Sequence, residues 1–231
     1  MRIALAAGIT LMVCGVSFMA YLGWLRSHPP AQPGADGAKG KLVGPDLSIP
    51  AFSLIDQNGQ TRDHSVVEGK VSVVWFMFTK CPLACPAMSV QAADLQKQLR
   101  SSGVQFVAFS LDPKSDRPDT LKEYGGRYSI DWNNWTFLTE PDAANGKRTG
   151  WDIYTQSLHQ FAEERKVTDQ PAGSQADETT IEHAMNFFLV GPDGKVIDWF
   201  NSNHPEEMTR LKERARGAAA FHAEKAAAAK R

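Results

Sequence analysis

Five short, mainly apolar runs along the chain predict β-strands. Residues 71–78 are apolar at both odd and even positions, which is typical of a central strand covered on each side. Residues 104–111 and 135–138 predict two further strands. Residues 187–190 and 196–200 flank a Gly-Pro-Asp-Gly turn, so they predict a late hairpin.

Helical patterns lie between these strands. The first has apolar residues at the spacing of one helix face, at Met88, Ala92, Leu95 and Leu99. Residues 118–128 predict a second helix, which two adjacent glycines weaken. Because strands alternate with helices, the sequence predicts a largely parallel α/β sheet.

The N-terminal segment has a different pattern. Residues 3–25 contain no charged residue and would span roughly 34 Å as a helix, enough to cross a hydrocarbon core of about 30 Å. A cleaved signal peptide has a shorter apolar stretch and a small-x-small cleavage site, which residues 27–32 match poorly. Cys14 fits a lipoprotein signal poorly because bulky Val13 precedes it. We therefore expect residues 1–26 to be an uncleaved, single-pass membrane anchor.

The rest of the chain divides by composition. Residues 27–46 are rich in Pro, Gly and Ala, which predicts a flexible linker. Residues 47–204 are long enough for one domain with a single core. Within this domain the polar residues 160–180 predict an exposed insertion. Residues 205–231 predict a C-terminal helix that ends in a frayed tail.

The charge pattern excludes one class of partner. The 25 Lys and Arg residues nearly balance the 26 Asp and Glu residues, which leaves a formal net charge of −1. No cluster of basic residues is interleaved with aromatic residues. We therefore expect no nucleic-acid partner.

The segment Cys81-Pro-Leu-Ala-Cys85-Pro86 joins the strand at 71–78 to the first helix. Its spacing brings two sulfurs close enough to share a soft metal ion or to close a small disulfide, and Pro86 suits the first position of a helix. If Cys85 lies at the helix N-terminus, the unpaired N–H groups there favour its thiolate, the form that binds metals and attacks disulfides. A cysteine pair after a central strand predicts a thioredoxin-like fold. Two buried packing cysteines are the alternative.

His183 differs from the other five histidines. It lies just before the buried run at 187–190, so its position should be fixed, whereas His28 and His222 belong to the linker and the tail. By spacing alone, His183 is as consistent with a structural histidine as with a metal ligand.

Four motifs occur together in one order. They are Phe78-Thr-Lys-Cys81-Pro-Leu-Ala-Cys85-Pro86, Ser110-Leu-Asp112-Pro113-Lys-Ser-Asp116-Arg-Pro118, Trp135-Thr-Phe-Leu-Thr139 and His183-Ala-Met-Asn-Phe-Phe-Leu-Val-Gly191-Pro-Asp-Gly194. In sequence, order and rough spacing, this set resembles the Sco/SenC/PrrC copper proteins, which serve the assembly of cytochrome c oxidase. The resemblance covers about residues 47–200.

The resemblance implies a thioredoxin-like domain on one N-terminal membrane helix, with the domain in the bacterial periplasm. It also implies that Cys81, Cys85 and His183 bind copper. Thiolates suit Cu(I), and an imidazole completes a Cys₂His set that also tolerates Cu(II). The implied function is that of a copper metallochaperone, whose partner is a copper-receiving membrane oxidase subunit or another copper chaperone.

Some positions depart from the family pattern or have more than one interpretation. Many relatives carry Asp where this chain has Leu83, and Ser or Thr where it has Ala184, which could alter the hydrogen bonds around the ligands. Asp112 and Asp116 match an Asp-Pro-x-x-Asp signature of the family. Short acidic residues beside prolines at a strand end are typical turn and cap residues, and a copper-relay or docking role is the alternative.

A different class of function is also consistent with the cysteine pair. A thiol:disulfide oxidoreductase would cycle Cys81 and Cys85 between dithiol and disulfide to keep a partner's copper-site cysteines reduced. His183 distinguishes the two functions, because dithiol exchange can proceed without it and three-coordinate copper cannot. A peroxidase is a weaker third hypothesis, since no Arg and Thr arrangement surrounds a lone cysteine.

Overall fold

A computed structural model describes residues 47–166 and 179–229, all within the unit that spans residues 43–231. The predicted anchor at 1–26 and the predicted linker at 27–46 lie outside these residues, as does the 167–178 part of the predicted insertion. Over the two described ranges, no helix combines the length and the apolar character needed to cross a membrane.

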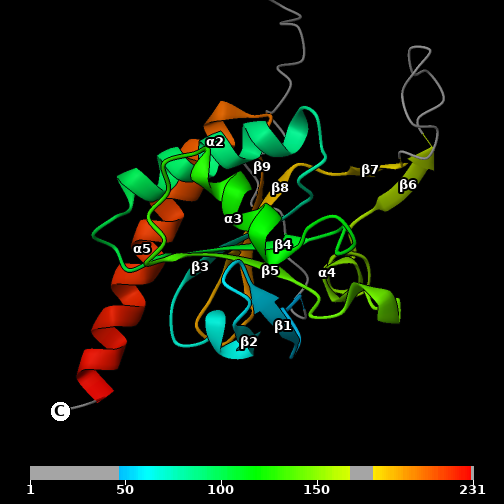
Figure 1. Cartoon of the computed structure of the whole chain (residues 1–231). Coiled ribbons are helices and arrows are strands. Elements are labelled where there is room, and N and C mark those ends of the chain that lie inside the picture. The colour runs from blue at the N-terminus through cyan, green and yellow to red at the C-terminus, as the bar shows by residue number, and fades with distance from the viewer. Residues whose placement is uncertain (1–46, 167–178, 230–231) are drawn as a thin grey trace, which may run out of the picture. The chain divides into compact units, whose positions relative to one another are not determined.

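A seven-stranded mixed sheet forms the centre of this unit (Figure 1). Its strands follow the order β2 (Thr61–Asp63), β1 (Ser53–Asp56), β5 (Trp135–Thr139), β4 (Gln105–Ser110), β3 (Ser72–Met77), β8 (Asn186–Val190) and β9 (Val196–Asn201). Strands β3, β4 and β5 are parallel, whereas β1 and β8 flank them in antiparallel orientation. The prediction of a largely parallel sheet therefore holds only for the centre. Each edge is a hairpin, and a tight turn can join only antiparallel neighbours.

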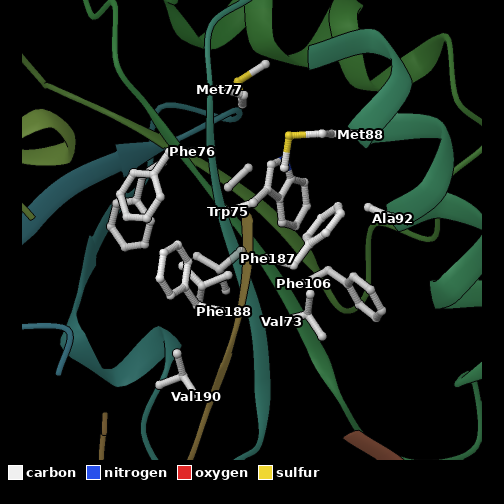
Figure 2. Close-up of a cluster of buried hydrophobic side chains, with 14 of the residues drawn as sticks. Val73, Trp75, Phe76, Met77, Met88, Ala92, Phe106, Phe187, Phe188 and Val190 are labelled. Atoms are coloured by element: carbon white, nitrogen blue, oxygen red, sulfur yellow. The ribbon is translucent and has the colours of Figure 1, made fainter. Parts of the chain in front are cut away.

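Strand β3 is buried on both faces, as its sequence predicts. On one face Trp75 packs edge-on against Trp135, with 4.9 Å between the ring centroids, and Met88 of α2 (Ala84–Gln98) lies on the same side (Figure 2). On the other face the Phe76 ring packs 4.8 Å from that of Tyr154. This two-sided burial holds the end of β3, and so the cysteine segment that follows it, in a fixed place.

Helices α2, α3 (Pro118–Gly126) and α5 (Pro205–Ala229) are the longer helices of the described chain. The sequence predicts Pro86 at the first position of a helix. It is the third residue of α2, because the helix already begins at Ala84. Proline is tolerated there because first-turn N–H groups have no acceptor within the helix.

Helix α5 packs beside α2 and β9. The Gln91 side chain of α2 donates to the Ser202 carbonyl just before α5, and Arg214 of α5 pairs with buried Asp198 of β9 at 2.9 Å. The sequence predicts a frayed tail, but the chain is helical through Ala229. Alanine, lysine and glutamate are good helix formers and sustain these last turns with few buried contacts.

A separate two-stranded ribbon projects from the sheet (Figure 1). Strands β6 (Ala162–Lys166) and β7 (Thr179–His183) pair antiparallel and form the described part of the predicted insertion at 160–180. The short helix α4 (Thr149–Asp152) and a π-helical turn, η4 (Ile153–Ser157), precede the ribbon. The remaining short elements are the 3₁₀ turns η2 (His64–Val66) and η3 (Ala143–Asn145).

Candidate metal centre

The two cysteines lie together where β3 gives way to α2. Cys81 is in the connecting loop, and Cys85 is the second residue of the helix. The Cys85 N–H donates to the Cys81 sulfur at 3.3 Å. Both thiols are free, and Cys85 is fully buried while Cys81 is 9% exposed. The strand-to-helix turn therefore brings the two sulfurs together, as the spacing predicts.

The Cys85 thiol and, after it, the N–H groups of the helix N-terminus favour the thiolate of Cys81, whereas the sequence predicted a thiolate at Cys85. The pKa of Cys81 falls to about 5, mainly because the Cys85 thiol donates a hydrogen bond to the Cys81 sulfur. Hydrogen bonds from the N–H groups of Cys85, Leu83 and Ala84 also lower this pKa. The same thiol–thiolate hydrogen bond, together with burial, raises the pKa of Cys85. At neutral pH the pair thus consists of an anionic Cys81 and a protonated Cys85.

His183 approaches this pair from the end of β7, 98 positions after Cys85. Its Nε2 atom lies 3.8 Å from the Cys85 sulfur. Its Nδ1 atom lies 3.1 Å from the Ala184 carbonyl oxygen, which can only accept, so Nδ1 carries the proton and Nε2 keeps its lone pair. Burial lowers the pKa of His183, which also favours the neutral ring. A neutral imidazole with a bare nitrogen is the form that ligates a metal.

The separation of the Cys85 sulfur and His183 Nε2 fits a shared metal ion. Bonds of about 2.3 Å to sulfur and about 2.0 Å to nitrogen, at an angle of about 120°, place two ligand atoms about 3.7 Å apart. Cys85 and His183 already have this separation. The three donors do not yet surround a common metal position. Among residues 47–166 and 179–229, no group of three His, Cys, Asp or Glu side chains is arranged to hold a metal ion.

Asp116 holds the start of the cysteine loop. Its buried carboxylate accepts hydrogen bonds from the Thr79 N–H at 3.0 Å, the Thr79 hydroxyl at 2.6 Å and the Ser110 hydroxyl at 2.6 Å. Burial raises the pKa of Asp116 to about 6. The Asp112 carbonyl accepts from the Asp116 N–H at 2.9 Å and so closes a turn. Asp112 therefore belongs to a turn, as one interpretation expects, whereas the Asp116 side chain joins the segments that follow β3 and β4 and does not cap α3.

Tyr154 is a site residue that the sequence analysis missed. Its hydroxyl accepts a hydrogen bond from the Ala184 N–H at 2.9 Å and donates to the Ala184 carbonyl at 3.2 Å. No local pattern could have indicated this contact, because the two residues are 30 positions apart and belong to different elements.

A pocket of about 560 Å³ opens onto the site, and Cys81 and His183 are part of its lining. Two exposed apolar side chains also line it, Leu83 at 79% exposure and Phe161 at 67%. The more accessible cysteine thus faces an opening with an apolar border.

Comparison with known proteins identifies the family. The family model described as SCO1/SenC matches residues 42–216. The chain belongs to the SCO1/SenC family. Among its relatives, the SCO1 protein homolog of Bacillus subtilis (strain 168) is 32% identical over 161 residues, which cover 68% of this chain and 75% of that protein.

Solved structures of Sco proteins have the same fold. BsSco, described as a member of the Sco family of cytochrome c oxidase assembly proteins in which a disulfide switch was identified, superposes with a TM-score of 0.58 at 27% identity, over 75% of this chain and 94% of that one. ScoI of Bradyrhizobium japonicum, solved with copper bound, has a TM-score of 0.56 at 24% identity, over 72% and 98% of the two chains. This second likeness shows the fold alone. The thioredoxin-like α/β fold is therefore confirmed, and copper binding is a property of Sco homologues.

Proposed function

We propose that this protein binds copper through Cys81, Cys85 and His183 and transfers it during the assembly of cytochrome c oxidase. The observation that carries the proposal is the approach of His183 Nε2 to 3.8 Å from the Cys85 sulfur, beside the Cys81 thiolate. Two sulfurs and one imidazole form a donor set that suits Cu(I) and tolerates Cu(II). Membership of the SCO1/SenC family supports this function.

The acceptor in this proposal is a copper-receiving membrane oxidase subunit or another copper chaperone. A partner's thiol reaches Cys81 through the pocket, and copper passes by exchange of ligands. Exposed Leu83 presents an apolar side chain at the opening, which favours a partner with an apolar surface around its own ligands. Residues 3–25 anchor the protein in the membrane, and the domain lies in the bacterial periplasm.

A copper-dependent melting shift tests this proposal. In the reduced full chain in detergent, about one copper ion should bind per chain. Free copper about a thousandfold above the dissociation constant should stabilise the folded state by roughly 4 kcal/mol. For a domain of this size the melting temperature should rise by about 8 to 16 °C.

The variant His183→Ala should lose much of this shift, and Cys81→Ser and Cys85→Ser should lose most of it. His204→Ala is a matched control, because His204 is a half-exposed histidine that pairs with Glu206. If His183→Ala keeps the full shift of the wild type, His183 does not ligate copper and the proposal fails.

A second candidate function is thiol:disulfide exchange, and the unequal pKa values of the two thiols favour it. The Cys81 thiolate attacks a partner disulfide, which forms a mixed disulfide and releases one partner thiolate. Cys85 then loses its proton and attacks Cys81, which releases the second partner thiolate and leaves a Cys81–Cys85 disulfide. Two electrons pass to the partner. This redox pair should continue to exchange with a small disulfide in His183→Ala and stop in Cys81→Ser.

Membrane attachment has its own test. The protein should stay in the membrane fraction after a carbonate wash, with residues 1–2 retained. Release of a domain that begins near residues 31–34 from untreated cells would show that the segment is cleaved.

A further inference from the structure

Tyr154 is buried beside the proposed copper ligands without being one of them. Its ring packs between two others, with its centroid 4.8 Å from Phe76 of β3 and 5.9 Å from His183. The residue belongs to the π-helical turn η4, so it reaches His183 from a different element than the cysteine pair. Single π-helical turns occur frequently at functional sites.

The Tyr154 hydroxyl makes two hydrogen bonds to the backbone of Ala184. It accepts from the Ala184 N–H and donates to the Ala184 carbonyl. That carbonyl also accepts from His183 Nδ1, so two donors fix its direction. Burial raises the pKa of Tyr154 to about 12, and the neutral phenol keeps the proton that it donates.

Ala184 lies between two strands that belong to different sheets. Strand β7 ends at His183 and pairs with β6, whereas β8 begins at Asn186 and pairs with the main sheet. Helix α4, which directly precedes the turn that carries Tyr154, packs closely on β4: a Cβ added at Gly150 would clash with the Ser110 carbonyl oxygen. The hydroxyl therefore ties the histidine segment to an element that is packed on β4.

We propose that Tyr154 is a positioning residue for His183: by holding the Ala184 peptide, its hydroxyl sets the tautomer and direction of the imidazole so that a bare Nε2 faces Cys85. The consequence for metal binding rests on the proposed function, whereas the effect on the His183 tautomer does not. Without the hydroxyl, the Ala184 carbonyl loses one of its two donors and the N–H loses its acceptor. The carbonyl can then turn away from Nδ1, and the ring can carry its proton on Nε2, where it blocks ligation.

The first test needs no copper. The full chain is labelled with ¹⁵N-histidine, reduced and studied in detergent, and the protonation of each His183 ring nitrogen is read from its NMR signals. The wild type should be protonated at Nδ1. Tyr154→Phe should raise the Nε2-protonated population severalfold. Thr155→Val is the matched control, because it removes a hydroxyl of the same turn that donates to the Trp151 carbonyl. A wild-type tautomer in Tyr154→Phe would overturn the proposal.

The second test measures copper affinity by competition with a chelator. Tyr154→Phe should still bind about one ion but about tenfold more weakly, and Thr155→Val should bind as the wild type does. Because Tyr154 acts through His183, adding Tyr154→Phe to His183→Ala should weaken binding no further. A full second loss in the double variant would show a merely structural role and overturn the proposal. If the wild type takes up no copper, the proposed function fails, and the tautomer comparison alone decides the role of Tyr154.

Discussion

Replacing Asp116 by Asn should change how the stability of this protein depends on pH. The carboxylate is fully buried and accepts three hydrogen bonds, two from Thr79 and one from Ser110. An asparagine keeps an oxygen for Thr79 and presents an N–H₂ group to the Ser110 hydroxyl oxygen. The substitution thus removes the charge and preserves most of the contacts.

The magnitude follows from the shift in pKa. Burial is the largest cause and raises the pKa of Asp116 from 3.8 to about 6. Between these values the folded state holds a proton that the unfolded state has released, so stability falls as the pH rises through this window. A shift of about two pKa units corresponds to about 3 kcal/mol, and most of this loss falls between pH 4 and pH 7. Asparagine does not titrate, so Asp116→Asn should not show this pH-dependent loss of stability.

Urea unfolding of the reduced full chain at several pH values measures the effect. The stability of Asp116→Asn relative to the wild type should increase by about 2 to 3 kcal/mol from pH 4 to pH 7. Cys81 titrates in the same range, but it is present in both proteins and cancels in the difference. Asp112→Asn, at a half-buried neighbour, is the matched control. A difference between Asp116→Asn and the wild type that is independent of pH would refute the reasoning.

Two further predictions concern the thiols and the glycines of α3. Alkylation of Cys81 by iodoacetamide should reach half its maximal rate near pH 5, and Cys85→Ala should move this midpoint upward because it removes the main cause of the lowered pKa; a wild-type midpoint above pH 8 would contradict this. Gly125→Ala should destabilise the fold by roughly 1 to 3 kcal/mol, because its Cβ would lie 2.5 Å from the Trp132 ring. Gly126→Ala meets nothing within 4 Å and should stabilise α3 by up to about 1 kcal/mol, as urea unfolding can measure. Equal effects of the two glycine substitutions would show that the close contact does not matter.

Local sequence patterns determined the elements around the site. The apolar run at 71–78 predicted a strand buried on both faces, and the spacing of Met88 and its neighbours predicted the helix that follows. Both are properties of consecutive residues, so periodicity records them. The cysteine pair is also a local feature, because a spacing of four positions across a strand-to-helix turn brings the two sulfurs together wherever that turn lies in the fold. The family followed from motifs whose order and spacing are also visible in the chain.

Only the tertiary structure decided which groups meet and how they ionise. The sequence placed the helix N-terminus next to Cys85, but in the fold the Cys85 thiol and the N–H groups act on the sulfur of Cys81. By spacing, His183 was equally consistent with a structural role. Its place beside Cys85 depends on the pairing of β6 with β7 and on the connection to β8. The contacts of Tyr154 with Ala184 and of Asp116 with Thr79 join residues 30 and 37 positions apart. Such contacts follow from the order of strands in the sheet and the packing of the elements on it, which no spacing between neighbouring residues records.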